Sequence, residues 1–219
     1  MKKFSFFQKN NYSKNDFEWR IFKIMAEFID GFDFISSFEG KKAVTIFGSS
    51  RVLPNNKNYK EAEKLGKILA KKGFVVVTGG ESGIMEAANK GAFGAEGESV
   101  GININLGKKR GVSNSYLHKS ICFDHFFVRK VMLSFASSYY VFFPGGYGTL
   151  DEFFEIITLV QTKKIDQKVK IILVGKEYWE GLKNWLKKEV FKKQKAIEEK
   201  DLDLFVIVDS AQEAAKLIK

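Results

Sequence analysis

The chain has 219 residues and a formal net charge of +10 at pH 7, with 45% hydrophobic and 28% charged residues. This length allows one α/β domain with a substantial core, and the apolar runs are too short for a membrane helix of ~20 residues. The single cysteine, Cys122, excludes an intrachain disulfide and a cysteine-cluster metal site. Because polar residues soon interrupt the N-terminal apolar residues, we expect no secretory signal, a cytoplasmic location and no membrane partner.

The positive charge is carried almost entirely by scattered lysines, for example at 71–72 and 187–188. Charge runs of this kind more often form solvated surface than a nucleic-acid-binding face. We therefore expect no nucleic-acid partner, and keep nucleic-acid binding as an alternative that salt-dependent affinity would reveal. Arginine is scarce, which draws attention to Arg51 and Arg129.

The first forty residues differ in pattern from the rest of the chain. Residues 1–15 are polar and asparagine-rich, and over residues 16–38 the apolar residues recur at helical spacing, as in Phe17, Ile21 and Ile24. We expect a tail and a helical extension over residues 1–40, with the helix packed on the main domain or on a partner chain.

Residues 41–219 are predicted to form a single Rossmann-like nucleotide-binding domain, because continuously apolar runs of strand length alternate there with helical patterns. The expected strands are 43–47, 74–78, 99–104, 139–143, 170–174 and 204–208, with a shorter one at 120–123. The expected helices are 57–72, 83–93, 125–137, 150–162, 177–193 and 210–218. The alternation predicts an α/β fold: a doubly wound parallel sheet of about six to seven strands with helices on both faces. Ligands would then bind at the carboxyl ends of the strands.

The most informative segment is PGGYGTLDE at residues 144–152, between a buried strand and the start of a helix. Backbone N–H groups at a helix N-terminus lack intrahelical partners, so a glycine-rich turn there forms a seat for an anion such as phosphate. Glu152 follows Thr149 by three residues and would lie close to whatever carries that anion. A helix capping box is an equally weighted alternative, because Thr149 and Glu152 have the T-x-x-E spacing.

Three further segments contain residues that a simple loop between a strand and a helix does not require. GSSR at 48–51 offers hydroxyl and guanidinium donors. TGGESGIMEAA at 78–88 is a second glycine-rich turn, for which close helix packing is at least as good an explanation as ligand binding. The pair at 129–130 lies on a helix and, taken alone, would face solvent. Neither glycine-rich turn has the GxGxxG or P-loop pattern, which disfavours NAD binding and ATP hydrolysis.

These four motifs, in this order and spacing over residues 41–190, resemble the LOG (Lonely guy) family in its bacterial branch, whose members older labels call lysine decarboxylases. The resemblance implies a phosphoribohydrolase, an N-glycosidase similar to AMP nucleosidase. Such an enzyme cleaves a nucleoside 5′-monophosphate, AMP-like or a cytokinin riboside monophosphate, to free base and ribose 5-phosphate. The resemblance also implies a homodimer or higher homo-oligomer.

We expect no cofactor and no metal. The chain has only two histidines and one cysteine, which are too few to form the usual ligand set of a zinc site. A lysine decarboxylase would require pyridoxal phosphate on a lysine, and no cofactor motif marks any of the lysines.

The resemblance also assigns roles to individual residues. Glu152 and Arg129 match the family's catalytic residues. The phosphate-binding residues would be Gly145, Gly146, Tyr147, Gly148 and Thr149. The other substrate-binding residues would be Gly48, Ser49, Ser50, Gly79, Gly80 and Lys130. Glu81 and Ser82 replace the glycine and proline that many relatives carry, which leaves the preferred base open.

In this hypothesis the carboxylate of Glu152 stabilises an oxocarbenium-like transition state, and Arg129 orients that carboxylate or binds a substrate oxygen. The acid that protonates the leaving base is not identified. The alternative is a non-catalytic nucleotide- or molybdopterin-type cofactor-binding protein, for which the phosphate seat alone would suffice. The presence of both Arg129 and Glu152 favours the enzyme.

Overall fold

The computed structural model describes residues 14–107, 113–166 and 168–219 of the chain. Its strands are β1 (Ala43–Phe47), β2 (Val75–Thr78), β3 (Ser99–Ile104), β4 (Lys119–Phe123), β5 (Tyr139–Phe142), β6 (Lys170–Val174) and β7 (Phe205–Val208). Its α-helices are α1 (Lys14–Ser36), α2 (Lys57–Lys71), α3 (Ile84–Phe93), α4 (Phe126–Phe135), α5 (Tyr147–Gln161), α6 (Lys176–Trp185) and α7 (Ala211–Leu217). Residues 1–13 of the predicted polar tail lie outside the described residues.

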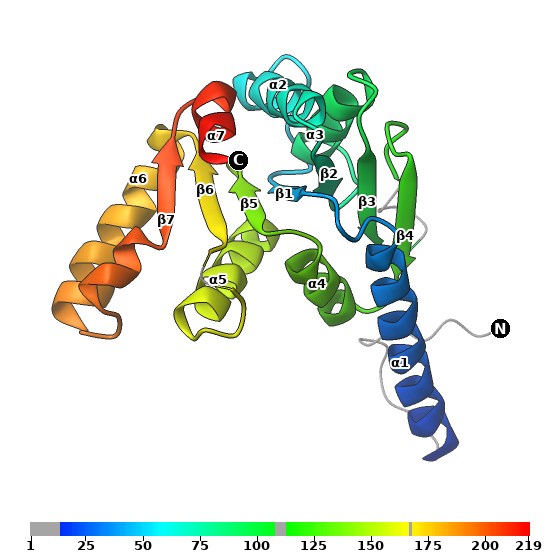
Figure 1. Cartoon of the computed structure of the whole chain (residues 1–219). Helices are drawn as coiled ribbons and strands as arrows, with labels where there is room; N and C mark the ends of the chain where they lie inside the picture. Colours follow the sequence, from blue (N-terminus) through cyan, green and yellow to red (C-terminus); the bar gives the residue numbers. More distant parts are fainter. Residues whose placement is uncertain (1–13, 108–112, 167) are drawn as a thin grey trace.

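The seven strands form one parallel sheet in the order β4-β3-β2-β1-β5-β6-β7 (Figure 1). This confirms the predicted doubly wound α/β fold. From β1 the chain moves outward through β2 and β3 to β4, and then returns to place β5 on the other side of β1. The strand order therefore reverses between β1 and β5, which pair with Val44 opposite Tyr139 and Phe47 opposite Phe142. In open α/β sheets, a ligand binds outside the carboxyl ends of the strands at such a reversal.

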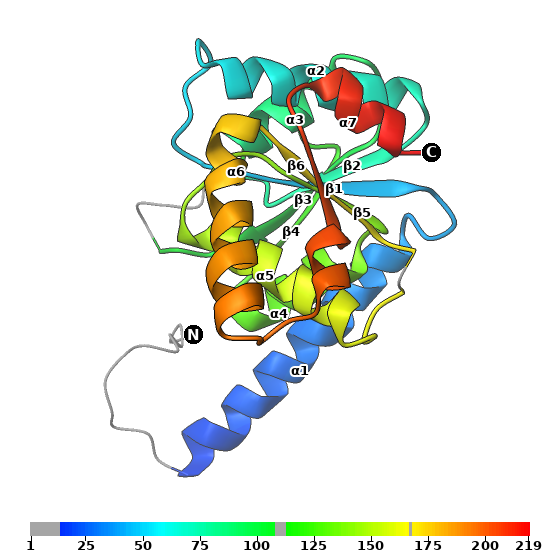
Figure 2. The same ribbon diagram turned by 90° about the vertical axis from the view of Figure 1, so that its left-hand side faces the viewer.

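Helices cover both faces of the sheet (Figure 2), so all five residues of β1 are buried. On one face, Val44 and Ile46 share a core cluster with Leu65 of α2 and with residues of α3 and α7. On the other face, α4, α5 and α6 pack together with part of α1, and Phe142 lies edge-on to Phe153 of α5. Burial on both faces explains why the strands are continuously apolar in sequence.

Most helices begin and end within one or two residues of the predicted bounds, and two differ by more. The helix expected from residue 150 begins at Tyr147, so part of the glycine-rich turn lies within the first turn of α5. The helix expected over 177–193 changes from α-helix to a π-helix at Leu186–Lys193. A short 3₁₀ helix at Glu199–Asp203 then leads into β7. Only the first of these differences affects the loops at the carboxyl edge of the sheet.

The N-terminal helix α1 lies against α4 and β4, and its first turns extend beyond the main body (Figures 1 and 2). Ile24 and Phe28 pack towards the core, whereas Phe22 and Ile29 on the same helix are exposed. Helix α1 approaches α4 closely at Gly31, where a Cβ would lie 2.5 Å from the sulfur of Met132. Within the described residues, no helix is both long enough and apolar enough to cross a membrane.

Candidate active site

A cavity of about 660 Å³ lies at the carboxyl edge of the sheet, around the ends of β1, β2 and β5. Its volume falls within the range of ~300–1,000 Å³ that is usual for small-molecule sites. The predicted site residues that line it are Gly48, Ser49, Ser50, Gly79, Arg129, Gly146, Tyr147, Gly148, Thr149 and Glu152. The fold thus brings together residues from four separate sequence motifs.

Three predicted site residues lie outside this lining. The ammonium group of Lys130 contacts carboxylates of α5 instead, at 2.7 Å from Asp151 Oδ2 and 3.3 Å from Glu155 Oε2. The carbonyl of Gly145 accepts a hydrogen bond from the hydroxyl of Tyr178 at 2.6 Å. The N–H of Gly80 donates to the hydroxyl of Thr78 at 2.9 Å. Lys130 therefore joins α4 to α5, and the two glycines shape the turns.

Within the described part of the chain, the cavity also has nine lining residues that were not among the predicted site residues: Phe47, Arg51, Glu81, Met85, Leu106, Phe126, Leu133, Leu150 and Asp151. Arg51 was marked by the scarcity of arginine, and Glu81 by its departure from the family pattern. Leu106 follows β3 and lies in no motif, whereas Phe126 begins α4, the predicted helix that carries Arg129 and Lys130. Neither apolar side chain was predicted as a site residue, and no sequence motif marked Leu106.

The glycine-rich turn leaves the N-terminus of α5 open towards the cavity. Gly146 is the N-cap of α5, and no side chain of the described residues caps it. The amides of Tyr147, Gly148 and Thr149 are in the first helical turn, where N–H groups lack intrahelical acceptors. Tyr147 lines the cavity and is 93% exposed, so its side chain does not close the helix N-terminus off from solvent.

The capping-box alternative for Thr149 and Glu152 is wrong. Thr149 lies inside α5 and is not its N-cap, so the geometry that a capping box requires is absent. Glu152 lies one turn further along the same helix, with its side chain buried at the cavity. The spacing of the two residues places both on one helix face.

Hydrogen bonds join the three loops that form the cavity rim. The N–H of Ser49 donates to the carbonyl of Pro144 at 3.1 Å, and the N–H of Ile84 donates to the carbonyl of Ser49 at 3.0 Å. The hydroxyl of Ser82 donates to the carbonyl of Ser50 at 2.9 Å. The loops after β1, β2 and β5 are therefore held in one arrangement.

Glu152 is a buried acid at the cavity whose pKa is shifted by its surroundings. It is only 6% exposed, and its Oε2 atom has no hydrogen-bond partner within the described part of the chain. Burial raises the pKa of Glu152 to about 8, and the neighbouring charge of Arg129 opposes that rise. The carboxyl group is thus largely protonated at neutral pH when no ligand is bound.

Arg129 is held beside Glu152 by backbone carbonyls of the sheet edge. Its Nε donates to the carbonyl of Ile102 at 2.9 Å, and its Nη2 lies 3.5 Å from the carbonyl oxygen of Gly79. Burial lowers the pKa of Arg129, while Glu152 and Glu81 act in the opposite direction. A guanidinium group retains its charge under such conditions. A Cβ at position 79 would overlap Nη2, so this placement of the guanidinium requires glycine there.

A second cavity of about 560 Å³ lies at the other edge of the sheet. Its lining includes Phe38, Lys41, Ala43 and Tyr139. Ala43 and Tyr139 are the first residues of β1 and β5, so this cavity is at the amino ends of the strands. Ligands of open α/β sheets bind at the opposite edge. We therefore locate the candidate active site in the larger cavity.

A family model described as "Possible lysine decarboxylase" matches residues 85–218, which is more than half of the chain. The chain belongs to this family, the LOG family. The matched segment begins within α3 and contains α4 and α5, which carry Arg129 and Glu152. Helix α1 and strands β1 and β2 precede it.

Two plant LOG-family relatives are similar to part of the chain. One, from Oryza sativa subsp. japonica, is named "Probable cytokinin riboside 5′-monophosphate phosphoribohydrolase" and is 30% identical over 59% of this chain and 52% of its own length. The chain thus spans about half of that relative. The other, from Arabidopsis thaliana, is named cytokinin riboside 5′-monophosphate phosphoribohydrolase and is 27% identical over 68% of this chain and 70% of its own length.

A solved structure shows the same fold. The molybdenum cofactor binding protein from the phototrophic bacterium Rippkaea orientalis superimposes with a TM-score of 0.61 at 23% sequence identity. The similarity covers 82% of this chain and 96% of that one. At this level of identity the likeness establishes the shared architecture alone.

Replacing Glu152 with glutamine should remove a pH-dependent loss of stability. The pKa of this carboxyl rises from 4.5 to about 8 on folding, so its protonated form stabilises the folded state. This contribution is complete below pH 4.5 and is lost as the pH rises towards and through the folded-state pKa. Relative to Glu152→Gln, the wild-type free energy of unfolding should fall by about 1.4 kcal/mol per pH unit or less between roughly pH 5 and 8. Thermal unfolding of both proteins measures this difference, and a constant value across the range would contradict it.

Replacing Gly79 with alanine should lower activity without a comparable loss of stability. The added Cβ would overlap the end of the Arg129 side chain, which can move away, so the guanidinium would be displaced from the site. For the catalytic role that the family resemblance implies for Arg129, misplacement by about 1 Å is expected to lower the rate by about 10²-fold. Gly181→Ala in α6 is the matched control, since open space surrounds that position in the described structure. Equal turnover of the two variants would show that Arg129 needs no such placement.

Proposed function

We propose that the chain is a phosphoribohydrolase that cleaves the N-glycosidic bond of a nucleoside 5′-monophosphate. One observation carries this proposal: the buried carboxyl of Glu152, with an unpartnered oxygen, lies beside Arg129 in a cavity that includes the open N-terminus of α5. The names of the plant relatives support the same reaction class. AMP-like and cytokinin-type monophosphates are both candidate substrates.

In this proposal the 5′-phosphate binds the first turn of α5. The amides of Tyr147, Gly148 and Thr149 would donate hydrogen bonds to the phosphate, and the helix dipole favours its negative charge. Charge-assisted hydrogen bonds of this kind are worth about 1.5–3 kcal/mol each. The phosphate would thereby fix the ribose over Glu152, one helical turn away. The base would extend towards the apolar side chains of Met85, Leu106 and Phe126 on the cavity wall.

The bond between C1′ of the ribose and the base nitrogen then breaks, and positive charge develops on C1′ and the ring oxygen. The ionised carboxylate of Glu152 would stabilise this charge, and the neighbouring charge of Arg129 favours that ionised form although burial opposes it. A water molecule adds to C1′, giving ribose 5-phosphate, and the departing base takes up a proton. The unpartnered Oε2 of Glu152 is available for the ribose hydroxyls or for the attacking water.

The geometry also bears on the other candidate functions. A pyridoxal phosphate enzyme needs a lysine for its Schiff base, and no lysine lines the cavity in the described part of the chain. A non-catalytic cofactor-binding protein could use the same phosphate seat, as the name of the Rippkaea orientalis protein suggests. A carrier has no evident use for a buried acid with a raised pKa, so we favour the enzyme.

The homo-oligomer that the family resemblance implies stays a prediction.

Incubation with a panel of nucleoside 5′-monophosphates should release free base and ribose 5-phosphate from at least one of them. The corresponding nucleosides should not react, because they lack the phosphate that binds α5. Glu152→Ala should lower kcat by about 10²–10⁴-fold, whereas Glu180→Ala on the exposed side of α6 should not change it. Chromatography of the released base measures both results. If no monophosphate releases base, the enzyme proposal fails and the binding-protein alternative is favoured.

The pH dependence of kcat/KM should follow the ionisation of Glu152 in the free enzyme. Because burial raises the pKa of Glu152 to about 8 and the carboxylate is the proposed working form, kcat/KM should rise from neutral pH and level off above that value. Initial rates at low substrate concentration between roughly pH 6 and 9 measure the profile. A value that falls over this range would show that the protonated acid is the working form and would contradict the carboxylate role.

A further inference from the structure

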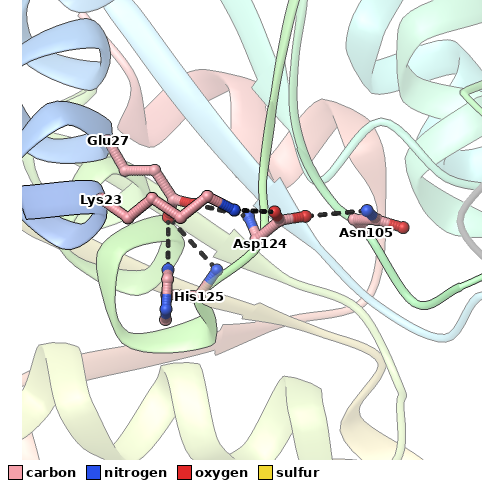
Figure 3. A network of polar contacts seen from close by, with 5 residues as sticks. All are labelled: Lys23, Glu27, Asn105, Asp124 and His125. Atoms are coloured by element: carbon pink, nitrogen blue, oxygen red, sulfur yellow. Dashed lines mark hydrogen bonds and ion pairs between the residues drawn. The ribbon is translucent and has the colours of Figure 1, made fainter. Parts of the chain in front are cut away.

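The N-terminus of α4 receives a carboxylate from a helix that is remote in sequence (Figure 3). Oε1 of Glu27 in α1 accepts a hydrogen bond from the N–H of Asp124 at 3.0 Å, and Oε2 accepts one from the N–H of His125 at 3.2 Å. His125 Nδ1 lies 3.0 Å from the same Oε2. Both carboxylate oxygens of Glu27 are thus used at the start of α4.

Helix α4 has no cap of its own. His125 is the N-cap residue and makes no side-chain cap hydrogen bond, and the first turn of α4 contains no acidic residue. Negative charge is favourable at a helix N-terminus and positive charge is not, yet α4 carries Arg129 and Lys130 close to that end. Glu27 supplies the missing negative charge from α1. The contact is largely shielded from water, since the side chains of Glu27 and His125 are 17% and 3% exposed.

A second contact ties α1 to the loop after β3. Asp124 accepts hydrogen bonds from Lys23 Nζ at 3.4 Å and from Asn105 Nδ2 at 2.8 Å. The N–H of Asn105 donates to the carbonyl of Phe123 at 2.8 Å. Asn105 directly precedes Leu106, which lines the cavity. The contacts of α1 therefore reach two parts of the cavity wall, α4 and the loop after β3.

These contacts lie one helical turn from the candidate catalytic arginine. The N–H of Arg129 donates to the carbonyl of His125 at 3.2 Å, which is the α-helical bond that begins at the N-cap. A shift in the backbone of His125 would therefore move Arg129 relative to Gly79 and Ile102, whose carbonyls hold its guanidinium. Gly31, packed against Met132, fixes α1 a second time near the middle of α4.

We propose that Glu27 is a positioning residue, through which α1 holds the start of α4 so that Arg129 points into the cavity. Helix α1 precedes the segment that the family model matches, so this role belongs to a part of the chain outside that match. The kinetic part of the test rests on the proposed function, whereas the positional part does not.

The test compares Glu27→Gln with Asp30→Asn. The glutamine keeps the shape of the side chain but has one acceptor oxygen, so the backbone N–H of either Asp124 or His125 would face an NH₂ group. Asp30 lies one turn further along α1 and is exposed, so its variant makes the same chemical change away from α4. If Glu27→Gln does not fold, Glu27→Asp, which retains the charge but is one methylene shorter, takes its place with the same expectations.

Two measurements on the ligand-free protein report position directly. Amide hydrogen exchange at the start of α4 should be about 10-fold faster in Glu27→Gln, because its N-terminal turn would lose a buried cap. The rate at which phenylglyoxal modifies Arg129, followed by mass spectrometry of peptides, should rise about 3-fold or more, since a displaced guanidinium is more accessible. Arg51 is the internal control and should react at the same rate in both proteins.

The kinetic measurement separates positioning from simple stability. In Glu27→Gln, kcat per folded molecule should fall by about 10-fold with a smaller change in KM, because the phosphate seat on α5 is untouched. Asp30→Asn should match the wild type. Unchanged exchange and unchanged Arg129 modification would overturn the proposal, and so would faster modification with an unchanged kcat. If the wild type cleaves no monophosphate, the proposed function fails by itself, and the modification rate of Arg129 decides the positioning role.

Discussion

Removing the carboxyl group of Glu152 from water costs free energy, and the protein around it compensates for this cost only in part. Burial raises the pKa of Glu152 to about 8, the charge of Arg129 opposes the rise, and Oε2 has no partner among the described residues. Most buried polar groups in proteins are hydrogen-bonded. An exception at the wall of a cavity indicates a position where a ligand supplies the missing interaction. The remaining features of the site serve to keep this acid and this cation together.

The sheet topology brings the acid and the cation to one crevice. The strand order reverses between β1 and β5, so α5 starts at β5, next to the central strand β1. Helix α4 is the helix through which the chain returns from the edge strand β4. Glu152 and Arg129 therefore approach from two helices on the same face of the sheet. Gly79 leaves room for the guanidinium at the end of β2, and Gly146 leaves the N-terminus of α5 uncapped. A nucleotide phosphate and its ribose could then bind along a single helix turn.

Much of this could be predicted from the sequence, for physical reasons that also explain the errors. Strands buried on both faces are continuously apolar, so 43–47 and 99–104 were predicted with their observed bounds. The start of α5 was predicted three residues late, because glycine has a low helix propensity although position 148 lies in the first turn. Lys130 was grouped with Arg129, yet neighbouring residues on a helix point about 100° apart, and only Arg129 faces the cavity. The contact between Glu27 and His125 spans 98 residues and follows no motif.

That long-range contact addresses an electrostatic difficulty in α4. A helix that presents a cation near its N-terminus places positive charge at the positive end of its own dipole. The difficulty increases when the cation is shielded from water, as Arg129 is, because low-dielectric surroundings strengthen the repulsion. An acid within the first turn of α4 would relieve it, but that turn borders the cavity through Phe126, and an acid there would repel an anionic substrate. The carboxylate on α1 lies outside the cavity lining. There it offsets the helix dipole of α4 and binds the backbone of His125 without facing the substrate.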